Sequence, residues 1–494
     1  MCSRACRTGS VGSKDPLDPN TRAPRRARFA ENATEPLFYA AVRDPDRFRW
    51  WLLGLASLTR LVWVLGVHPP GEAMFSDMAH YVARAQHLVD AGIVLGDRSL
   101  AWQAWGTHTL LAIPLALVGA HSSSALVLAG LIWAACSVGT VVLGYALARA
   151  VLPETWGVWP ARAVGLALLV WIPLLSHTGM FISETPYACA LTGATLAAVV
   201  LVQTGERPVL AGCVAALAFV LRPQSGVFFA LIGLLWLIDR LGGWGTFARV
   251  TPRRALLYAL PLVLALGFSL VRFRVHTGYF GGVAESATMN FTAGRCHNIV
   301  TQAFPDAEAL AQSEAKGSTK DGRRISLPGF RALGRRGPDH LLALRPALGH
   351  ESIKFVGPIG DPDVHRAIRS RCYAATGVVE QLRYSIVNVA LLWVIARPWP
   401  ESSDAKHPEL FELALRGRDL AAIVAPLGLF GLILALATWR RDPALALVGL
   451  QLLSLLFVSA LVFGAPRLRT PHDPAALVLG VAAIGRLVRG GPAR

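Results

Sequence analysis

The sequence predicts an all-α polytopic membrane protein with about ten transmembrane helices, within a range of roughly eight to twelve. Its composition and a series of long apolar runs carry this prediction. Hydrophobic residues make up 53% of the 494 residues and charged residues only 16%, whereas about a quarter of the residues in soluble domains are charged. A soluble chain of this length could not cover so much apolar surface. The composition therefore excludes a soluble enzyme, a disordered chain and a small disulfide-rich scaffold.

The apolar runs give the expected spans in chain order. The first 48 residues are polar and rich in arginine, without an apolar signal region, so we expect a basic cytoplasmic tail and then an uncleaved anchor. Apolar runs of span-like character lie at 50–67, 124–147, 161–177, 185–203, 208–222, 224–240, 254–273, 419–438, 443–463 and 472–488. A shorter run at 106–119 contains Pro114. We expect a re-entrant or interfacial helix there rather than a crossing.

The basic residues set the orientation of the chain. With the N-terminus inside, the inner loops and their flanks hold about 21 lysines and arginines, in line with the positive-inside rule. The short outer loops hold five: Arg84, Arg98, Arg222, Arg467 and Arg469. The net charge of +17 thus follows from topology, and no nucleic-acid partner is expected. Only five of the 48 basic residues are lysines, which is typical of a GC-rich bacterial genome and points to a bacterial inner membrane.

The spans and loops divide the chain into four parts. The tail at 1–48 precedes a transmembrane half at 49–275, which includes an outer loop with a helix at 69–105. A hydrophilic outer segment covers 276–418, and the last spans cover 419–494. The outer segment has a helical pattern from Asp363 to Gln381, followed by an apolar stretch at 384–395 that suits an interfacial helix.

Two of the seven cysteines, Cys296 and Cys372, fall in the outer segment, and no CxxC pair occurs. An oxidising compartment would allow a disulfide bond between them. The alternative is two unpaired buried thiols.

The first outer loop carries a carboxylate at the start of an amphipathic helix. Its apolar side repeats at helical spacing through Met78, Val82, Ala85 and Val89. Asp77, Tyr81 and Arg84 share the opposite side. Asp77 is a candidate catalytic residue, and Tyr81 and Arg84 are candidate substrate contacts. The alternative is that Ser76 or Asp77 only caps the helix.

A second candidate carboxylate, Glu184, lies where the run at 161–177 returns into the run at 185–203. Ionisable groups at membrane depth are costly and are therefore functional candidates. The alternative is an N-cap cluster of Ser183 and Glu184 ahead of Pro186.

Several arginines lie on the outer side, against the general charge bias. Arg222 is in a tight turn between two spans, Arg467 and Arg469 precede the last span, and Arg272 and Arg274 end another span. Guanidinium groups bind phosphate oxygens in pairs, so these five residues are candidates for a phosphate site. The alternative is that each reaches up to lipid headgroups.

Taken in order, these pieces resemble the GT-C superfamily of membrane glycosyltransferases. The branch is similar to the protein O-mannosyltransferase-like and aminoarabinose-transferase-like enzymes of glycosyltransferase family 39. The motifs that carry the resemblance are Ser76-Asp77-Met-Ala-His-Tyr81, Ser183-Glu184-Thr-Pro186, Leu221-Arg222-Pro223 and the segment from Pro466 to Pro474. Their order covers roughly 50–275 and 420–488.

The resemblance implies a polyprenyl-phosphate sugar as donor, and transfer with inversion to an acceptor hydroxyl at the outer face. The acceptor would be a glycan, a lipid or a protein. Asp77 matches the catalytic carboxylate of the first outer loop. Many relatives carry an acidic pair there, whereas Asp77 stands between Ser76 and Met78. We therefore predict no metal and no other cofactor. The polar segment around His297 could bind sugar or acceptor.

Two other functions fit many apolar spans. A transporter or lipid flippase usually has broken polar helices near the midplane and two related halves, and the sequence has neither feature. An inactive subunit that binds polyprenyl lipids is the other alternative, and the retention of Asp77 together with the arginines argues against it.

Overall fold

The computed structural model describes residues 47–71, 74, 76–296, 300–315, 323–326, 352–393 and 408–488. The predicted tail therefore lies outside the described residues, apart from its last two positions. Seven described helices are long and apolar enough to cross a membrane. They are α2 (Phe48–Val62, continued by η2, Trp63–Val67), α5 (Ser123–Val151), α8 (Glu184–Thr204), α10 (Ser225–Gly242), α11 (Pro252–Thr277), α15 (Pro408–Ala437) and α16 (Pro443–Leu461). The prediction of a helical, multi-pass membrane protein is confirmed.

The other three predicted runs are also helical but differ in length or shape. The run at 161–177 forms two helices, α6 (Trp159–Leu169) and α7 (Ile172–Thr178), with a bend of 44° between them. The runs at 208–222 and 472–488 form the shorter helices α9 (Pro208–Leu221) and α18 (Asp473–Val488). Counting the bent pair as one span gives up to eight helices that pass by length and composition among the described residues.

The bend between α6 and α7 is stabilised by a buried arginine of α2. Arg60 donates hydrogen bonds to the carbonyl oxygens of Leu168 and Leu169, at 3.1 and 2.5 Å, at the point where the regular helical pattern is interrupted. Irregular backbone within a membrane is tolerated only where protein groups satisfy it. Arg60 therefore has a structural explanation for its place inside a span.

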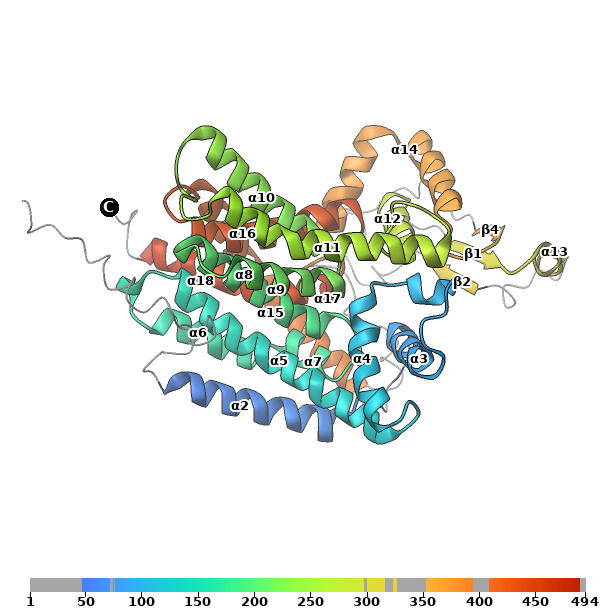
Figure 1. Ribbon diagram of the computed structural model, residues 1–494, viewed down its shortest axis with the longest axis horizontal. Helices are drawn as coiled ribbons and strands as arrows, with labels where there is room; N and C mark the ends of the chain where they lie inside the picture. The colour runs from blue at the N-terminus through green and yellow to red at the C-terminus, as the bar shows by residue number, and fades with distance from the viewer. Residues whose placement is uncertain are drawn as a thin grey trace, which may run out of the picture. The chain divides into compact units, whose positions relative to one another are not determined.

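The short apolar run at 106–119 forms α4 (Trp105–Val118), which does not cross the bundle. Helix α3 (Ser76–Ala91) precedes α4, and its Met78 and Val82 pack in one cluster with Phe181 from the α7–α8 connection. Helix α5 and the α6–α7 pair are the two crossings between these residues. A third crossing by α4 would place them at opposite ends, so α4 stays at the end where α3 lies (Figure 1). We call this the α3 end of the bundle.

The part of the outer segment that the structure describes contains a small sheet, which the all-α prediction did not include. Its elements are α12 (Glu285–Arg295), β1 (Val300–Phe304), α13 (Ala307–Ala315), β2 (Arg323–Ser326), β4 (Ser352–Val356) and α14 (Pro362–Ala390). The strand order is β2-β1-β4. Strand β1 pairs with β2 antiparallel, with Val300 opposite Ser326, and with β4 in parallel, with Val300 opposite Ser352.

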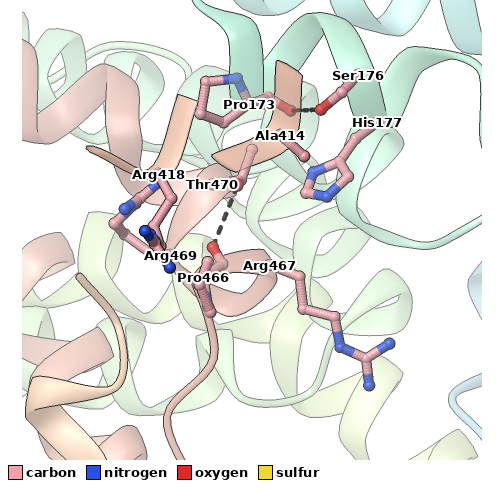
Figure 2. Close-up of a pocket in the computed structure, with 9 residues that line it drawn as sticks. All are labelled: Pro173, Ser176, His177, Ala414, Arg418, Pro466, Arg467, Arg469 and Thr470. Atoms are coloured by element: carbon pink, nitrogen blue, oxygen red, sulfur yellow. Dashed lines mark hydrogen bonds between the residues drawn. The ribbon is translucent and has the colours of Figure 1, made fainter. Parts of the chain in front are cut away.

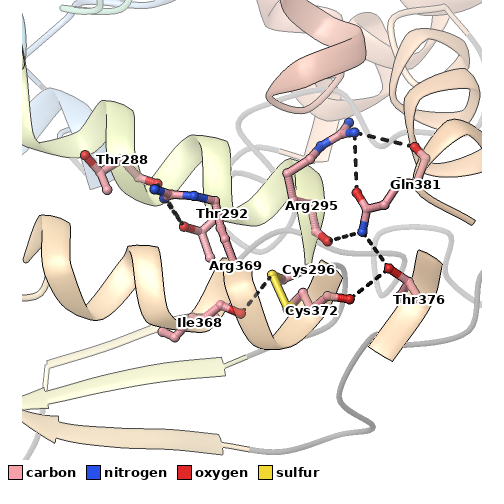
Figure 3. The surroundings of a disulfide bond; sticks show 9 residues. All are labelled: Thr288, Thr292, Arg295, Cys296, Ile368, Arg369, Cys372, Thr376 and Gln381. Carbon is pink, nitrogen blue, oxygen red and sulfur yellow. Dashed lines mark hydrogen bonds between the residues drawn. A yellow bond between two sulfur atoms is a disulfide. The ribbon is translucent and has the colours of Figure 1, made fainter. Parts of the chain in front are cut away.

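Helix α14 is attached to α12 by a disulfide bond and by polar contacts. Cys296 and Cys372 are joined in the structure, with 5.6 Å between their Cα atoms (Figure 3). The guanidinium of Arg295 donates to the Ser385 hydroxyl and to the backbone carbonyl of Ala460 at the end of α16. Gln381 donates to the carbonyl of Arg295 at 3.0 Å. The outer segment is thus tied both to itself and to a membrane span.

Candidate active site

Helix α3 places Asp77 in its first turn. The predicted apolar side is buried, with Met78 and Ala85 fully covered. The opposite side is largely buried too, because Tyr81 and Arg84 face protein rather than solvent. Arg84 donates a hydrogen bond to the Gln103 side chain, and its guanidinium lies 5.3 Å from the centre of the Tyr81 ring. The helix therefore packs on two sides.

Asp77 is ion-paired with Arg467. The distance from Asp77 Oδ2 to Arg467 Nη1 is 2.7 Å, although the residues are 390 positions apart in sequence. The Asp77 side chain is 30% exposed and that of Arg467 is 19% exposed, so both are reachable from outside the protein. The structure thus joins the first outer loop to the loop before the last span.

Glu184 and Arg222 extend this contact into an alternating row of charges. Arg222 Nη2 lies 3.0 Å from Glu184 Oε1, and Arg467 Nε lies 4.0 Å from the same oxygen. Glu184 is 2% exposed and begins α8, and the Ser183 hydroxyl bonds its other oxygen at 3.3 Å. Ser183 stands at the N-cap position but makes no side-chain cap. The row is Asp77, Arg467, Glu184 and Arg222.

The charges in this row set the acidity of Asp77. Burial raises the pKa of the Asp77 carboxyl, but the charge of Arg467 and its hydrogen bond lower it, and Arg222 and His80 lower it further. The net pKa of Asp77 is below its usual value. Burial lowers the pKa of Arg467, and Asp77 and Glu184 raise it to a net value above normal. Both groups are therefore charged at neutral pH, and their attraction holds them together.

The loop that carries Arg467 is held closely by neighbouring backbone. Gly464 leaves no room for a Cβ, which would collide with the carbonyl oxygen of Asn388 in α14. Pro466 then starts the short helix α17 (Pro466–Arg469), which continues into η7 (Thr470–His472). Figure 2 shows the Arg467 side chain extended away from Arg469 and Arg418. The local fold thus directs the two arginines of one short helix to different places.

A small cavity lies between α7, α15 and the short helix α17 that carries Arg467. It measures about 20 Å³ and is lined by Pro173, Ser176, His177, Ala414, Arg418, Pro466, Arg467, Arg469 and Thr470 (Figure 2). A volume of this size holds about one water molecule. Three of the lining residues are arginines (Arg418, Arg467 and Arg469), so positive charge lies next to the row.

Three of the predicted phosphate-binding arginines lie outside the row. Arg469 is paired with Asp473 at 2.9 Å and donates to the carbonyl of Leu392. Arg272 donates to the carbonyl oxygens of Leu100, Gln103 and Val283, and so fixes the outer loops to α11. Arg274 is exposed. Of the five predicted arginines, the structure brings only Arg222 and Arg467 to the two candidate carboxylates, Glu184 and Asp77.

Some predicted residues are not placed, and some neighbours were not predicted. His297 lies outside the described residues. His177 lines the cavity, and the Tyr187 ring lies 5.8 Å from the Arg222 guanidinium. No motif in the sequence distinguishes these two residues from other polar groups near span ends. Only the folded arrangement brings them to the site.

The described residues hold no group of three or more His, Cys, Asp or Glu side chains that could bind a metal ion. Asp77 and Glu184 each face an arginine instead. The absence of a metal remains a prediction from the sequence.

The fold and the site define a polytopic membrane protein with paired carboxylates and arginines at one end of its helices. No protein-family model matches the chain, and no curated protein matches it. Four solved chains do. One is the oligosaccharyltransferase AglB of Archaeoglobus fulgidus with an inhibitory peptide and a dolichol-phosphate. It has 13% identity and a TM-score of 0.40 over 90% of this chain and 52% of that one.

The apo form of the Archaeoglobus fulgidus enzyme aligns at 11% identity with a TM-score of 0.45, over 90% of this chain and 51% of that one. ArnT from Cupriavidus metallidurans, bound to undecaprenyl phosphate, aligns at 13% identity with a TM-score of 0.37, over 89% and 79%. The chain spans about half the length of the archaeal enzyme. The activity of this chain is therefore argued from its own residues.

Proposed function

We propose that this protein is an integral membrane glycosyltransferase that moves one sugar from a polyprenyl-phosphate donor to an acceptor hydroxyl, with inversion. The observation that supports it is the row of Asp77, Arg467, Glu184 and Arg222 at the α3 end of the bundle. The row combines a partly exposed carboxylate with two arginines, next to helices long enough to hold a lipid tail between them. Glycan, lipid and protein acceptors all fit the proposal.

The acceptor hydroxyl needs a base, and Asp77 is the carboxylate of the row that solvent reaches. In the proposed step the acceptor oxygen attacks the anomeric carbon while the bond from that carbon to the phosphate oxygen breaks on the opposite face. Asp77 takes the hydroxyl proton, and the lipid phosphate leaves with the bonding electron pair. Glu184, at 2% exposure, is too covered to meet an acceptor and serves to hold the two arginines.

The leaving phosphate needs positive charge, which Arg222 and Arg467 supply. Arg222 Nη1 is buried and has no hydrogen-bond partner among the described residues, so this donor remains for a ligand. Arg467 is bound to Asp77 when no donor is present. A donor phosphate would compete for Arg467, release Asp77 and make it a stronger base. Donor binding thus prepares the base for the acceptor.

The charge bias of the loops supports a site on the outer face of a bacterial inner membrane. Asp77, Glu184, Arg222 and Arg467 all lie in loops, or at helix ends, that this bias assigns to the outside.

The test is sugar transfer by the purified protein in bilayers, from a panel of radiolabelled polyprenyl-phosphate sugars to membrane acceptors. We expect Asp77→Asn to reduce the rate about a hundredfold or more, because the amide keeps the shape and most hydrogen bonds but cannot accept the proton. Asp90→Asn is the matched control. Asp90 lies on the same helix and is 50% exposed. Among the described residues, its ion-pair partner is His121, which is also on the surface.

Equal transfer by wild type and Asp77→Asn would show that Asp77 is not the base and that its role is confined to the ion pair with Arg467. Donor binding by both proteins without any transfer would contradict the enzyme and favour a transporter or an inactive lipid-binding subunit.

A further inference from the structure

Helix α14 bends sharply in its middle. Gly377 has φ +72° and ψ −179°, a conformation that side chains other than glycine rarely adopt. The bend divides α14 into a first limb at 362–376 and a second limb at 378–390. Figure 1 shows the two limbs meeting at an angle, with the second limb crosswise to the long helices. The second limb contacts α16, a membrane span.

The second limb is apolar on the side that faces away from the protein. Its four large apolar side chains there are highly exposed: Val378 (85%), Val379 (82%), Leu382 (61%) and Ile386 (61%). Positions 378, 382 and 386 are four residues apart and lie along one face of a helix. We call these four residues the apolar stripe. Tyr384, Val387 and Asn388 on the other face are fully buried.

Rigid contacts fix where the apolar stripe lies along the bundle. Arg295 connects Ser385 of the second limb to the carbonyl of Ala460, one residue before the end of α16. The carbonyl of Asn388 packs against Gly464, three residues after α16 ends. The second limb is therefore held at the level where a span leaves the membrane. Its exposed face does not come from a loose attachment.

Charges lie beside the stripe rather than within it. Glu380 and Arg383 form an ion pair at 3.7 Å, and their side chains are 21% and 43% exposed. An apolar face bordered by charged residues is the pattern of a helix that lies in a membrane interface. A solvated helix of the outer segment would gain nothing from four exposed apolar side chains.

We propose that the second limb of α14 lies in the membrane–water interface at the α3 end, with the apolar stripe among the lipid acyl chains. Such helices bury their apolar face about 5–10 Å into the boundary between the headgroups and the acyl chains. The occupant of this face is the lipid of the bilayer itself, since the limb is held at the end of α16, where the apolar residues Phe457 (55%) and Leu461 (39%) are also exposed. The first limb and the disulfide Cys296–Cys372 remain outside the lipid in this arrangement.

The consequence for the site is direct. The second limb packs on the loop between α16 and α17. Leu392, two residues after the end of the second limb, accepts a hydrogen bond from Arg469 through its carbonyl oxygen. Seating the limb in lipid therefore supports the backbone that carries Arg467. This part of the inference does not depend on which reaction the site performs.

The test is the accessibility of spin labels in phospholipid vesicles. The background replaces Cys2, Cys6, Cys136, Cys189 and Cys213 with serine and keeps the disulfide. Nitroxides are attached at Val379→Cys and Leu382→Cys, and the control is Ala367→Cys, an exposed position on the first limb. Dissolved oxygen concentrates in lipid, whereas a nickel chelate stays in water.

We expect the ratio of oxygen to nickel accessibility to be several-fold higher at positions 379 and 382 than at 367. Equal nickel access at all three positions would overturn the proposal, because the stripe would then face water. Protection from both reagents at 379 and 382 would also overturn it, because a protein surface would then cover the stripe. The label at 367 gives the accessibility of a water-exposed position on the first limb of the same helix, against which positions 379 and 382 are compared.

Discussion

At the scale of single residues, the arrangement depends on Arg467, which contacts both carboxylates of the row. Its bond to Asp77 keeps that carboxylate ionised, and it also weakens Asp77 as a base. A base in this state works well only if another anion takes over the arginine. In the proposed function, the guanidinium group of Arg467 is both the resting partner of Asp77 and a ligand of the donor phosphate, and this predicts a pH effect.

Replacing Arg467 with glutamine should move the acidic limb of the pH–rate profile to higher pH. Burial raises the pKa of Asp77, and Arg467 is the first of the groups that lower it, ahead of Arg222 and His80. Without Arg467 the pKa of Asp77 rises, so the carboxylate becomes protonated and inactive at a pH where the wild type still works. The measurement is kcat/KM against pH in the acidic range for both proteins, using the labelled donor.

The control is Arg469→Gln, which changes an arginine of the same short helix that is paired with Asp473 instead. Its acidic limb should stay at the wild-type pH, whatever happens to its overall rate. If the limbs of Arg467→Gln and wild type coincide, Asp77 does not determine the acidic limb.

At the scale of elements, the bend in α14 depends on one glycine. Gly377 has open space around its Cα, so a Cβ meets no atom within 4 Å, but its φ of +72° is unfavourable for any L side chain. Gly377→Ala should therefore destabilise the protein by about 1–3 kcal/mol through backbone strain alone. The measurement is the midpoint of thermal unfolding in detergent, followed by fluorescence.

Gly267→Ala is the matched control for that substitution. Gly267 lies in the middle of α11, also has nothing within 4 Å of a Cβ, and has no positive φ. Alanine is the better helix former there, so this variant should match or exceed the wild-type midpoint. Equal midpoints for the two alanine variants would contradict the strain at Gly377.

The elements also show what the sequence could predict. Long apolar runs and the tight turn at Arg222 were predictable, because span length and helix breakers are local properties. The ion pair between Asp77 and Arg467 joins residues 390 positions apart, and no local pattern encodes such a contact. The sheet β2-β1-β4 was missed for a similar reason. Its strands have only four or five residues and pair across long connections.

The arginines show the same limit more sharply. Arg222, Arg272, Arg467 and Arg469 have equivalent positions in sequence, since each lies at the outer end of a span. In the folded protein, Arg222 and Arg467 pair with carboxylates of the row. Arg272 bonds to backbone carbonyls, and Arg469 pairs with Asp473. Charge and position could therefore name the candidates, but only packing separates a binding residue from a structural one.

At the scale of the whole molecule, the site places strict limits on topology. Asp77, Glu184, Arg222 and Arg467 come from four separate connections, and their contacts require an even number of crossings between each pair. Two crossings, α5 and the bent α6–α7 pair, separate Asp77 from Glu184. Two more, α8 and α9, separate Glu184 from Arg222, and four (α10, α11, α15 and α16) separate Arg222 from Arg467. The first of these numbers is even only if α4 stays at the α3 end. The expectation that 106–119 does not cross thus follows from the site as well as from the charges.

The remaining question is which side of the membrane the α3 end faces, and the charge bias predicts the outside. His121→Cys lies between α4 and α5 at the α3 end, and Ala248→Cys lies between α10 and α11 at the opposite end. Both positions are exposed, so a membrane-impermeant maleimide can reach either one from its own side. In the background without the other free cysteines, we expect intact bacterial cells to label position 121 and only opened cells to label position 248. The reverse pattern would place Asp77 and the arginines on the cytoplasmic side, where the proposed outer-face transfer could not occur. Labelling of both positions in intact cells would mean that the reagent had entered the cells.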